Sequence, residues 1–557
     1  MAAVVAGGLA MISLTTRAVE LGTSGRMTTG IAGPPYNLRL GHQTVRRSSA
    51  PQLLADAAVP VESSSPPFAV VVGAGPAGLA VAIVLAERGW NVTVLEKRLE
   101  SSMYESQRAY LYLIDGRGQR FTDEFGLTDE LASLSVSSEN YTITRCKPDG
   151  SRETVVPPIL EKTPKPSYWI PRQEFIALLC RKAASMPNAP RLLFDSEMLG
   201  ATRQPPLEGG RIELRARQGT QLVTFTPTLL VGADGLRSKV RSLCAEWSAR
   251  PSAFSPVELP SPSTGLKYKM LRLPPSFRLD ATDASAVAEP RKAYAIYGDT
   301  RAPLGKARLG LLPVANPVYP RTANVILPPS HPVWGLASGG EVKGWLKETF
   351  PQLPVDEVIS DEEAESFAQL DGGAFPAPCY SPEQQLLLPG AAVALVGDSC
   401  HAFPPDIGQG VNSALNDVRL FAAALDAARN ASASPHGPKE MLEAALPAYG
   451  RAAKKEAEAV ARIAQVGFPY QYNQGTALER GLWFANFMLR TFVLSRFAPK
   501  LFSPAAIVLV QRSHLSYSEV WKLAGSTTRR IWTLASSLLA VAVAVATRGL
   551  WRRALHF

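Results

Sequence analysis

The pattern of apolar and polar positions is most regular between Phe68 and Lys97. A β-branched run, Val70 to Val72, predicts a buried strand, and the mostly apolar stretch up to Arg88 predicts a helix that Gly89 ends. A second apolar run, Val92 to Leu95, predicts another strand. Strand, helix and strand in this order predict a Rossmann-type unit of an α/β fold.

A glycine-rich turn joins the first predicted strand to the helix, with the spacing G-x-G-x-x-G. The first glycine permits a tight turn, the second lets the backbone approach a pyrophosphate, and the third lets helix and strand pack. The helix N-terminus offers N–H groups to the phosphates, and an acid after the second strand can accept the hydrogen bonds of a ribose. The predicted cofactor-binding residues here are Gly73, Gly75, Ala77, Gly78 and Glu96. FAD and NAD(P) both fit this motif.

Two later stretches repeat the arrangement of an apolar strand followed by a small residue and an acid. Leu229 to Arg241 predicts a strand that ends at Asp234-Gly235, and a short helix from about Ser238. Ala391 to Leu425 predicts a strand that ends at Gly397-Asp398. Both acids can accept a hydrogen bond from a hydroxyl group of a cofactor's sugar or ribityl chain.

After the second of these strands, Gly408-Gln409-Gly410 precedes a helix that is predicted to begin near Val411. The backbone from Gly408 to Asn412 can stabilise negative charge that develops on a flavin ring, because it forms a helix N-terminus. His401 is expected to pack beneath the cofactor rather than act as a base.

Two arginines are candidates for contacts with anions. Arg172 follows a predicted strand and begins a helix, which suits a phosphate or ribose contact, although an unliganded helix start is equally compatible. Arg108 could bind a substrate anion, and a surface arginine is the simpler interpretation from composition. Further strands are predicted at 308–312 and 323–327, and helices at 341–350 and 438–465.

Length and cysteine usage set the broad class. A chain of 557 residues is too long for one compact core, so two or more domains are expected. Its five cysteines are scattered without C-x-x-C spacing, which argues against a metal site or a disulfide framework and indicates a reducing compartment.

The net charge of +10 is concentrated at the C-terminal end. From Arg480 onward there are eleven Lys or Arg residues and a single acid, Glu519, so that this segment alone carries +10. It is also rich in aromatic and apolar residues, which indicates contact with membrane lipid rather than nucleic acid. Ile531 to Thr547 is uncharged and flanked by arginines, which predicts a membrane anchor over residues 529–552; a buried terminal helix is the alternative.

Residues 1–66 contain five arginines, no lysine and three acids among many Ser, Thr and Ala residues. This composition predicts an organellar transit peptide, or else a disordered tail. With the anchor, it predicts an organellar membrane, either mitochondrial or chloroplast.

The three motifs in this order, without a second G-x-G-x-x-G, resemble the single-component FAD-dependent aromatic hydroxylases. The resemblance implies a discontinuous FAD-binding domain over 67–430, an interleaved substrate-binding sheet at about 250–375, and a helical region over 431–525. It implies FAD as cofactor, NADPH or NADH as co-substrate, and O2, with oxygen transfer to a small aromatic substrate through a flavin C4a-hydroperoxide.

Within that family the chain is most similar to the kynurenine 3-monooxygenases, on the stretches Gln107 to Gly118, Gly408 to Asn412 and Tyr470-Gln471-Tyr472. By this resemblance Arg108 would bind the substrate carboxylate, with Asn412 and either Tyr470 or Tyr472 completing the site. The chain departs from that pattern at Pro405-Asp406-Ile407, where the family has Pro-Phe-Phe, and at Asn416, where it has an acid. The alternatives are a hydroxylase or epoxidase of an isoprenoid or quinone, and a non-catalytic flavin-binding membrane protein.

Overall fold

The computed structural model describes residues 66–100, 110–156, 165–205, 209–431 and 437–554. Its central element is a six-stranded sheet in the order β20-β21-β12-β1-β2-β8, parallel except for the edge strand β20. The strands are β1 (Phe68–Val72), β2 (Asn91–Leu95), β8 (Arg191–Leu193), β12 (Leu229–Gly232), β20 (Gln385–Leu387) and β21 (Ala392–Leu395). Four of these run as almost continuous apolar segments, as expected for parallel strands that are buried on both faces.

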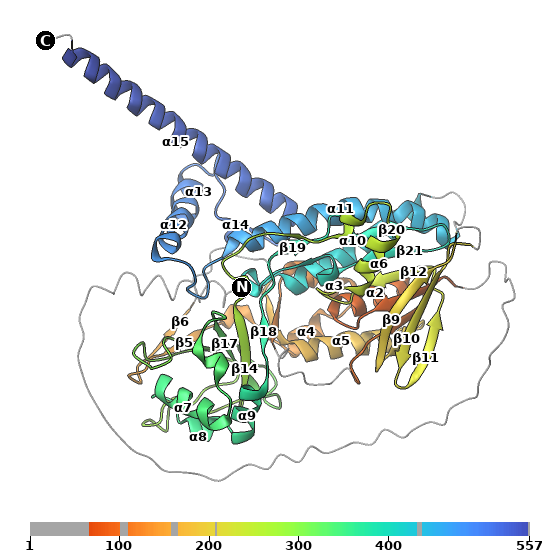
Figure 1. Cartoon of the computed structure of the whole chain (residues 1–557), viewed down its shortest axis with the longest axis horizontal. Coiled ribbons are helices and arrows are strands. Elements are labelled where there is room, and N and C mark those ends of the chain that lie inside the picture. Colours follow the sequence, from red (N-terminus) through yellow and green to blue (C-terminus); the bar gives the residue numbers. More distant parts are fainter. Residues whose placement is uncertain (1–65, 101–109, 157–164, 206–208, 432–436, 555–557) are drawn as a thin grey trace.

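Both faces of this sheet are covered (Figure 1). One face packs on helices α2 (Pro76–Glu87), α5 (Arg172–Ala184), α10 (Gly410–Asn430) and α11 (Pro438–Gly467). The other face packs on α6 (Lys239–Trp247) and on a small antiparallel sheet of β9 (Ser196–Arg203), β10 (Ile212–Gln218) and β11 (Gln221–Phe225). The β1-α2-β2 unit that the sequence predicts is therefore confirmed.

A second, seven-stranded sheet lies beside the first in the order β18-β14-β17-β16-β15-β5-β6. Its strands are β5 (Ile143–Cys146), β6 (Arg152–Val155), β14 (Lys267–Leu273), β15 (Ala293–Tyr297), β16 (Arg308–Leu311), β17 (Arg321–Leu327) and β18 (Gly373–Ala374). One face packs on α7 (Gly339–Thr349), α8 (Val355–Val358) and α9 (Asp361–Gln369). The sheet thus includes β5 and β6, which precede the range of about 250–375 that the sequence analysis assigned to it.

Shorter elements connect the two sheets. One small sheet joins β3 (Leu111–Ile114), β7 (Tyr168–Pro171) and β4 (Val136–Ser137), and another joins β13 (Val257–Glu258), β19 (Cys379–Tyr380) and β22 (His401–Ala402). Helices α3 (Gly116–Glu124) and α4 (Thr128–Ser133) follow β3. Two single-turn 3-10 helices follow β21: η6 (Gly397–Ser399) precedes β22, and η7 (Pro405–Ile407) follows it.

The C-terminal region is helical and ends in a long helix that projects from the rest of the chain (Figure 1). It comprises α12 (Ala477–Met488), the π-helix η8 (Leu489–Leu494), α13 (Ser495–Phe497), α14 (Ala506–Leu509) and α15 (Tyr517–Ala554). Among the described residues, one helical segment, Tyr517–Val545, is long and apolar enough to span a membrane, and its most apolar part is fully exposed. The predicted transit peptide lies outside the described residues, apart from its last residue.

Candidate active site

The three sequence motifs meet at one edge of the six-stranded sheet. Val72 of β1 pairs in register with Leu95 of β2 on one side and with Gly232 of β12 on the other. Gly232 in turn pairs with Leu395 of β21. Because these four strands are parallel and end at the same level, the residues that follow them line one crevice, which is where open α/β sheets bind ligands.

The glycines of the first turn have different structural roles. Gly73 has a φ of +103°, and a Cβ atom there would lie 2.4 Å from the carbonyl oxygen of Ala233. A Cβ atom on Gly78 would lie 1.9 Å from the carbonyl oxygen of Gly73. A Cβ atom on Gly75 would meet nothing within 4 Å, and Gly75 lines the cavity together with Ala77. The first and third glycines are thus required by packing, whereas the second leaves open space beside the N-terminus of α2.

Glu96 follows β2 and is almost completely buried. One carboxylate oxygen accepts a hydrogen bond from the backbone N–H of Ala74 at 2.8 Å, and the other accepts from the N–H of Arg98 at 3.0 Å. Burial raises the pKa of Glu96, but the Arg98 guanidinium and these N–H donors outweigh it and hold the pKa below its usual value. Glu96 is therefore an ionised acceptor that also fixes the glycine turn.

Asp234 and Gly235 follow β12 and line the same cavity. The Asp234 carboxylate accepts hydrogen bonds from the Ser238 hydroxyl at 2.6 Å and from the Val240 N–H at 3.2 Å. Gly235 has a φ of +82°, in the left-handed region that favours glycine. Asp234 thus holds the turn into α6, and the sugar contact that the sequence suggested stays a prediction.

Asp398 follows β21 and lines the cavity. Its exposed surface faces the inside of this cavity. Its enclosed position raises its pKa above the usual value, and the positive charge of Arg172 acts in the opposite direction. Arg172 begins α5, lines the cavity and donates its backbone N–H to the carbonyl oxygen of Tyr110. Arg172 and Asp398 thus line the same cavity, together with Tyr112, whose pKa both charges affect.

Behind Asp398, a buried pair supports the turn. The Asp417 carboxylate accepts the Gly397 N–H at 3.0 Å and lies 2.7 Å from Nε2 of His401. Gly397 has a φ of +63°. Burial lowers the pKa of His401, but Asp417 and Asp398 together raise it, and the net shift is upward. His401 is fully buried and is not part of the cavity wall, in agreement with the packing role expected for it.

The Gly408–Asn412 segment divides between cavity and interior. Gly408, Gly410 and Val411 line the cavity, and Gly408 has a φ of +62°. Asn412 is fully buried and does not line it. Its side chain accepts the Asp115 N–H at 3.1 Å and donates to the carbonyl oxygen of Leu113 at 2.8 Å. The structure therefore places Asn412 as a tie between α10 and β3, away from the substrate contact expected from sequence.

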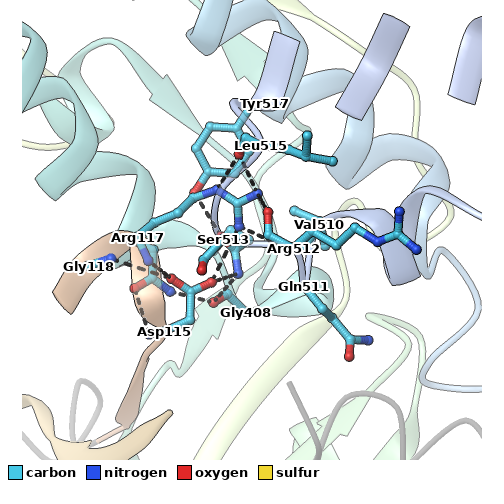
Figure 2. Close-up of polar contacts among 12 residues, drawn as sticks. Asp115, Arg117, Gly118, Gly408, Val510, Gln511, Arg512, Ser513, Leu515 and Tyr517 are labelled. Atoms are coloured by element: carbon cyan, nitrogen blue, oxygen red, sulfur yellow. Dashed lines mark hydrogen bonds and ion pairs between the residues drawn. The ribbon is translucent and has the colours of Figure 1, made fainter. Parts of the chain in front are cut away.

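Gln409 is also buried, and it connects the loop to the C-terminal helix. Its amide group donates to Asp115 at 3.0 Å and accepts from the Tyr517 hydroxyl at 2.7 Å. Figure 2 shows Asp115 and Tyr517 on either side of Arg117, whose guanidinium lies 4.8 Å from the Tyr517 ring centre and donates to the carbonyl oxygens of Val510, Arg512 and Leu515. The cluster Asp115, Arg117, Gln409 and Tyr517 thus joins the first turn of α15 to the loop at the cavity.

The crevice continues into a larger space under the seven-stranded sheet, and the whole cavity measures ≈3420 Å³. The walls of its second part are rich in aromatic side chains: Tyr141, Trp169, Tyr294, Phe403, Phe468, Tyr470, Tyr472, Trp483 and Phe484. Tyr470 and Tyr472 thus line the cavity, and their contact with a substrate stays a prediction. Arg108 lies outside the described residues. Sequence reasoning missed Tyr112, and also Arg308 on β16, which only the sheet register brings to the wall.

Comparison with known proteins agrees with this geometry. The sequence model of a protein family described as "FAD binding domain" matches residues 68–249 and 390–459, which contain all three motifs. Kynurenine 3-monooxygenase of Salinispora tropica is 26% identical over 407 residues, covering 72% of this chain and 79% of that protein. The chain belongs to the FAD-dependent monooxygenases.

Other relatives of this monooxygenase act in different reactions. Violacein synthase of Chromobacterium violaceum is 26% identical over 374 residues, covering 64% of this chain and 77% of the relative. Among solved structures, aklavinone-11 hydroxylase with FAD and aklavinone has a TM-score of 0.53 at 20% identity, covering 74% of this chain and 70% of that one. 2-Methyl-3-hydroxypyridine-5-carboxylic acid oxygenase has a TM-score of 0.50 at 20% identity, and the match covers 78% of this chain and 96% of the oxygenase. These structures share the fold.

The residues of the monooxygenase fit FAD. The open space at Gly75 next to the α2 N-terminus suits a pyrophosphate, and ionised Glu96 at the end of β2 suits a ribose. Asp398 faces the cavity at the place where a ribityl chain would pass, and the N-terminus of α10 begins at Gly410 where a flavin ring would end.

Proposed function

We propose that this protein hydroxylates a small aromatic substrate, using FAD as cofactor, NADPH or NADH as electron donor and O2 as the oxygen source. The observation that supports this most is the single cavity, in which a dinucleotide crevice opens directly into an aromatic-walled space. FAD, when bound, supplies the redox chemistry that activates O2 and delivers one oxygen atom to the substrate. The protein supplies orientation, exclusion of water and placed charges.

The residues have separate parts in this proposal. The ADP part of the cofactor is held by the first turn and the acid after β2, that is, by Gly73, Gly75, Ala77, Gly78 and Glu96. The middle of the cofactor is flanked by Arg172, Asp234, Gly235, Gly397 and Asp398. The flavin ring faces the N–H groups of Gly408, Gly410 and Val411. Tyr470 and Tyr472 contact the substrate from the aromatic wall. By the kynurenine 3-monooxygenase resemblance, Arg108 binds a substrate carboxylate. Asn412 positions the loop rather than the substrate.

We also propose that the C-terminal region attaches the enzyme to a membrane, with α15 as the anchor. Along the continuous helix α12-η8-α13, exposed apolar side chains recur at helical spacing beside the base of α15: Leu478, Leu482, Leu489, Phe492 and Val493. Arg490 of this helix donates to the Ala524 carbonyl and the Thr528 hydroxyl of α15, so the two apolar surfaces are held together. An organellar location, mitochondrial or chloroplast, follows from the composition of the N-terminal segment.

Turnover with L-kynurenine tests the proposed reaction. The full chain, purified in detergent with FAD bound, is expected to oxidise NADPH faster when L-kynurenine is present and to form 3-hydroxykynurenine. Bound FAD with substrate-dependent NADPH oxidation but no hydroxylated product would indicate a reductase that releases peroxide. Bound FAD without NADPH oxidation with any ligand would instead indicate a non-catalytic flavin-binding membrane protein.

A second candidate is a hydroxylase or epoxidase of an isoprenoid or quinone. Helix α12 favours it, because the helix lines the cavity through Gly481, Trp483 and Phe484 and carries the exposed apolar side chains on its other side. A lipid-soluble substrate could thus reach the cavity from the membrane. Activity with a quinone in lipid vesicles, and none with kynurenine, would select this candidate.

A further inference from the structure

Residues of the seven-stranded sheet line the cavity. On β16 they include Arg308 and Gly310, and on β15 they include Tyr297 and Ala295, which pair with them in register. Arg145 of β5 pairs with Ala295 and so points to the same face. Two arginines two strands apart therefore stand on the cavity face of a sheet whose neighbouring side chains are small or aromatic.

Arg308 differs from the other arginines of this sheet. Arg152, Arg272 and Arg321 bind carboxylates or carbonyl oxygens. Within the part of the chain that the structure describes, no hydrogen bond or ion pair is formed by the Arg308 side chain. Arg145 is nearly buried and lies 3.7 Å from the half-exposed Glu153, while its Nε atom is buried without a partner among the described residues. The sheet thus keeps one unpaired guanidinium and one partly paired guanidinium at the cavity.

Arg308 lines the same cavity as Tyr472 and Gly408. Burial raises the pKa of Tyr472, an ionised Asp406 would raise it further, and the positive charge of Arg308 lowers it. Asp406 is two residues before Gly408, in the turn that leads to the α10 N-terminus. Tyr472 also lines the cavity, and its ring packs against Phe375 at 5.5 Å between centres. Arg308 and Tyr472 therefore share the wall of one cavity, which the loop at Gly408 also lines.

We propose that Arg308, assisted by Arg145 and Tyr472, forms an anion subsite in the substrate cavity. A guanidinium in a poorly hydrated wall binds a carboxylate or a phosphate through two parallel hydrogen bonds, and a tyrosine hydroxyl can add a third. The anion is either the carboxylate of an aromatic substrate or the 2′-phosphate of NADPH. The subsite rests on the proposed function, but it is distinct from the contact assigned to Arg108.

Binding to the full chain in detergent, with FAD bound, tests this proposal. The probes are matched pairs that differ by the anion alone: L-kynurenine against its decarboxylated amine, anthranilate against aniline, and NADPH against NADH. Aromatic ligands are followed by the change that they cause in the flavin absorption spectrum, and nucleotides by KM for flavin reduction. The variants are Arg308→Gln and Arg308→Lys, with Arg181→Gln as control, since Arg181 is a half-exposed arginine that is paired with Glu130 and does not line the cavity.

Arg308→Gln is expected to weaken binding of the anionic member of one pair by about tenfold or more, as for loss of a charge-assisted hydrogen bond, and to leave its neutral partner unchanged. Arg308→Lys should restore part of this loss, and Arg181→Gln should cause none. If Arg308→Gln weakens binding of the carboxylate probes alone, the bound anion is the substrate carboxylate. If it weakens binding of NADPH alone, the bound anion is the 2′-phosphate. Equal effects on both members of every pair, or no effect, would overturn the subsite. If wild type binds anthranilate but not kynurenine, the substrate assignment fails while the subsite is still tested.

Discussion

The Tyr517 hydroxyl donates a hydrogen bond of 2.7 Å to the side-chain oxygen of Gln409. Tyr517 opens the helix that carries the candidate membrane span, and Gln409 lies between two glycines that line the cavity. Both side chains are buried. The C-terminal helix and the loop at the flavin position are thus in direct contact, and a change at one is expected to be detected at the other.

The first prediction concerns this contact. Tyr517→Phe removes the hydroxyl and leaves the Gln409 oxygen buried without its donor, which should destabilise the fold by about 1–3 kcal/mol. Because Gln409 holds the loop, FAD affinity and the fine structure of the flavin absorption spectrum should change as well. Thr527→Val is the control, since Thr527 is equally buried on α15 but bonds to Ser503, far from the loop. Equal flavin spectra and FAD affinities in the two variants would contradict the coupling.

The second prediction separates two glycines of one motif. Gly75→Ala places a methyl group in open space at a compatible φ of −75°, so the chain should fold but bind FAD much more weakly. Gly78→Ala places a methyl group 1.9 Å from a backbone oxygen and should prevent the turn from forming. Circular dichroism and thermal unfolding report the fold, and titration of flavin fluorescence reports FAD affinity. Gly75→Ala with wild-type FAD affinity would remove the phosphate assignment.

The third prediction concerns Asp406, which stands where the resemblance to kynurenine 3-monooxygenases implies an aromatic residue. Its side chain is fully buried, and neither carboxylate oxygen has a hydrogen bond of good geometry among the described residues. Burial raises the pKa of Asp406 to about 7, although the Ser263 hydroxyl lowers it. Between about pH 4 and pH 7 the folded chain therefore binds one proton more than the unfolded chain, and its free energy of unfolding falls as the pH rises.

At pH 7 and above, ionisation of the buried Asp406 carboxyl lowers the free energy of unfolding by on the order of 4 kcal/mol, and this loss is absent below about pH 4. Asp406→Asn should remove that part of the pH dependence, so that its stability changes less between pH 5 and pH 7. Urea unfolding in detergent at several pH values measures the slope. Asp299→Asn, which changes a half-buried loop carboxylate whose pKa is lowered by Arg301, should keep the wild-type slope above pH 5. A wild-type slope in Asp406→Asn would show that Asp406 is ionised when folded.

The fourth prediction compares two acids on α10. Asp417→Asn weakens the acceptor that holds the Gly397 N–H and His401, so the turn that presents Asp398 should loosen and FAD affinity should fall by about tenfold. Asp426→Asn breaks a partly exposed ion pair with Arg88 and should change stability by about 1 kcal/mol or less, with no effect on FAD. FAD dissociation constants for the two variants decide the matter; similar values would make Asp417 a purely structural residue.

The sequence was sufficient where a short pattern determines a short structure. The turn at Gly73 and the strand ends at Asp234 and Asp398 could be predicted, because an apolar run and the residues after it define a parallel strand and its edge. The destination of a side chain was harder to predict. Asn412 was expected at the substrate, but its amide group satisfies backbone groups of Leu113 and Asp115, which are 299 and 297 residues away.

Other parts of the site depend on pairings that no local pattern reveals. Arg308 reaches the cavity because of its register with Tyr297, and a shift of one residue would turn it to the opposite face. Tyr517 and Gln409 are 108 residues apart, and neither has a local feature that predicts the other. Such contacts arise from packing of complete domains, so they become visible only in three dimensions.

The side-by-side arrangement of β1, β12 and β21 also sets the order in which this enzyme can become functional. During synthesis β1 leaves the ribosome early, but its neighbour β12 follows only at Leu229, and β21, which pairs with β12, follows only at Ala392. Pairing of such distant strands is slow, because long loops must close before any contact stabilises them. The cofactor crevice cannot be complete until α10 has been made, so acquisition of flavin colour should be a late event that reports assembly of nearly the whole chain.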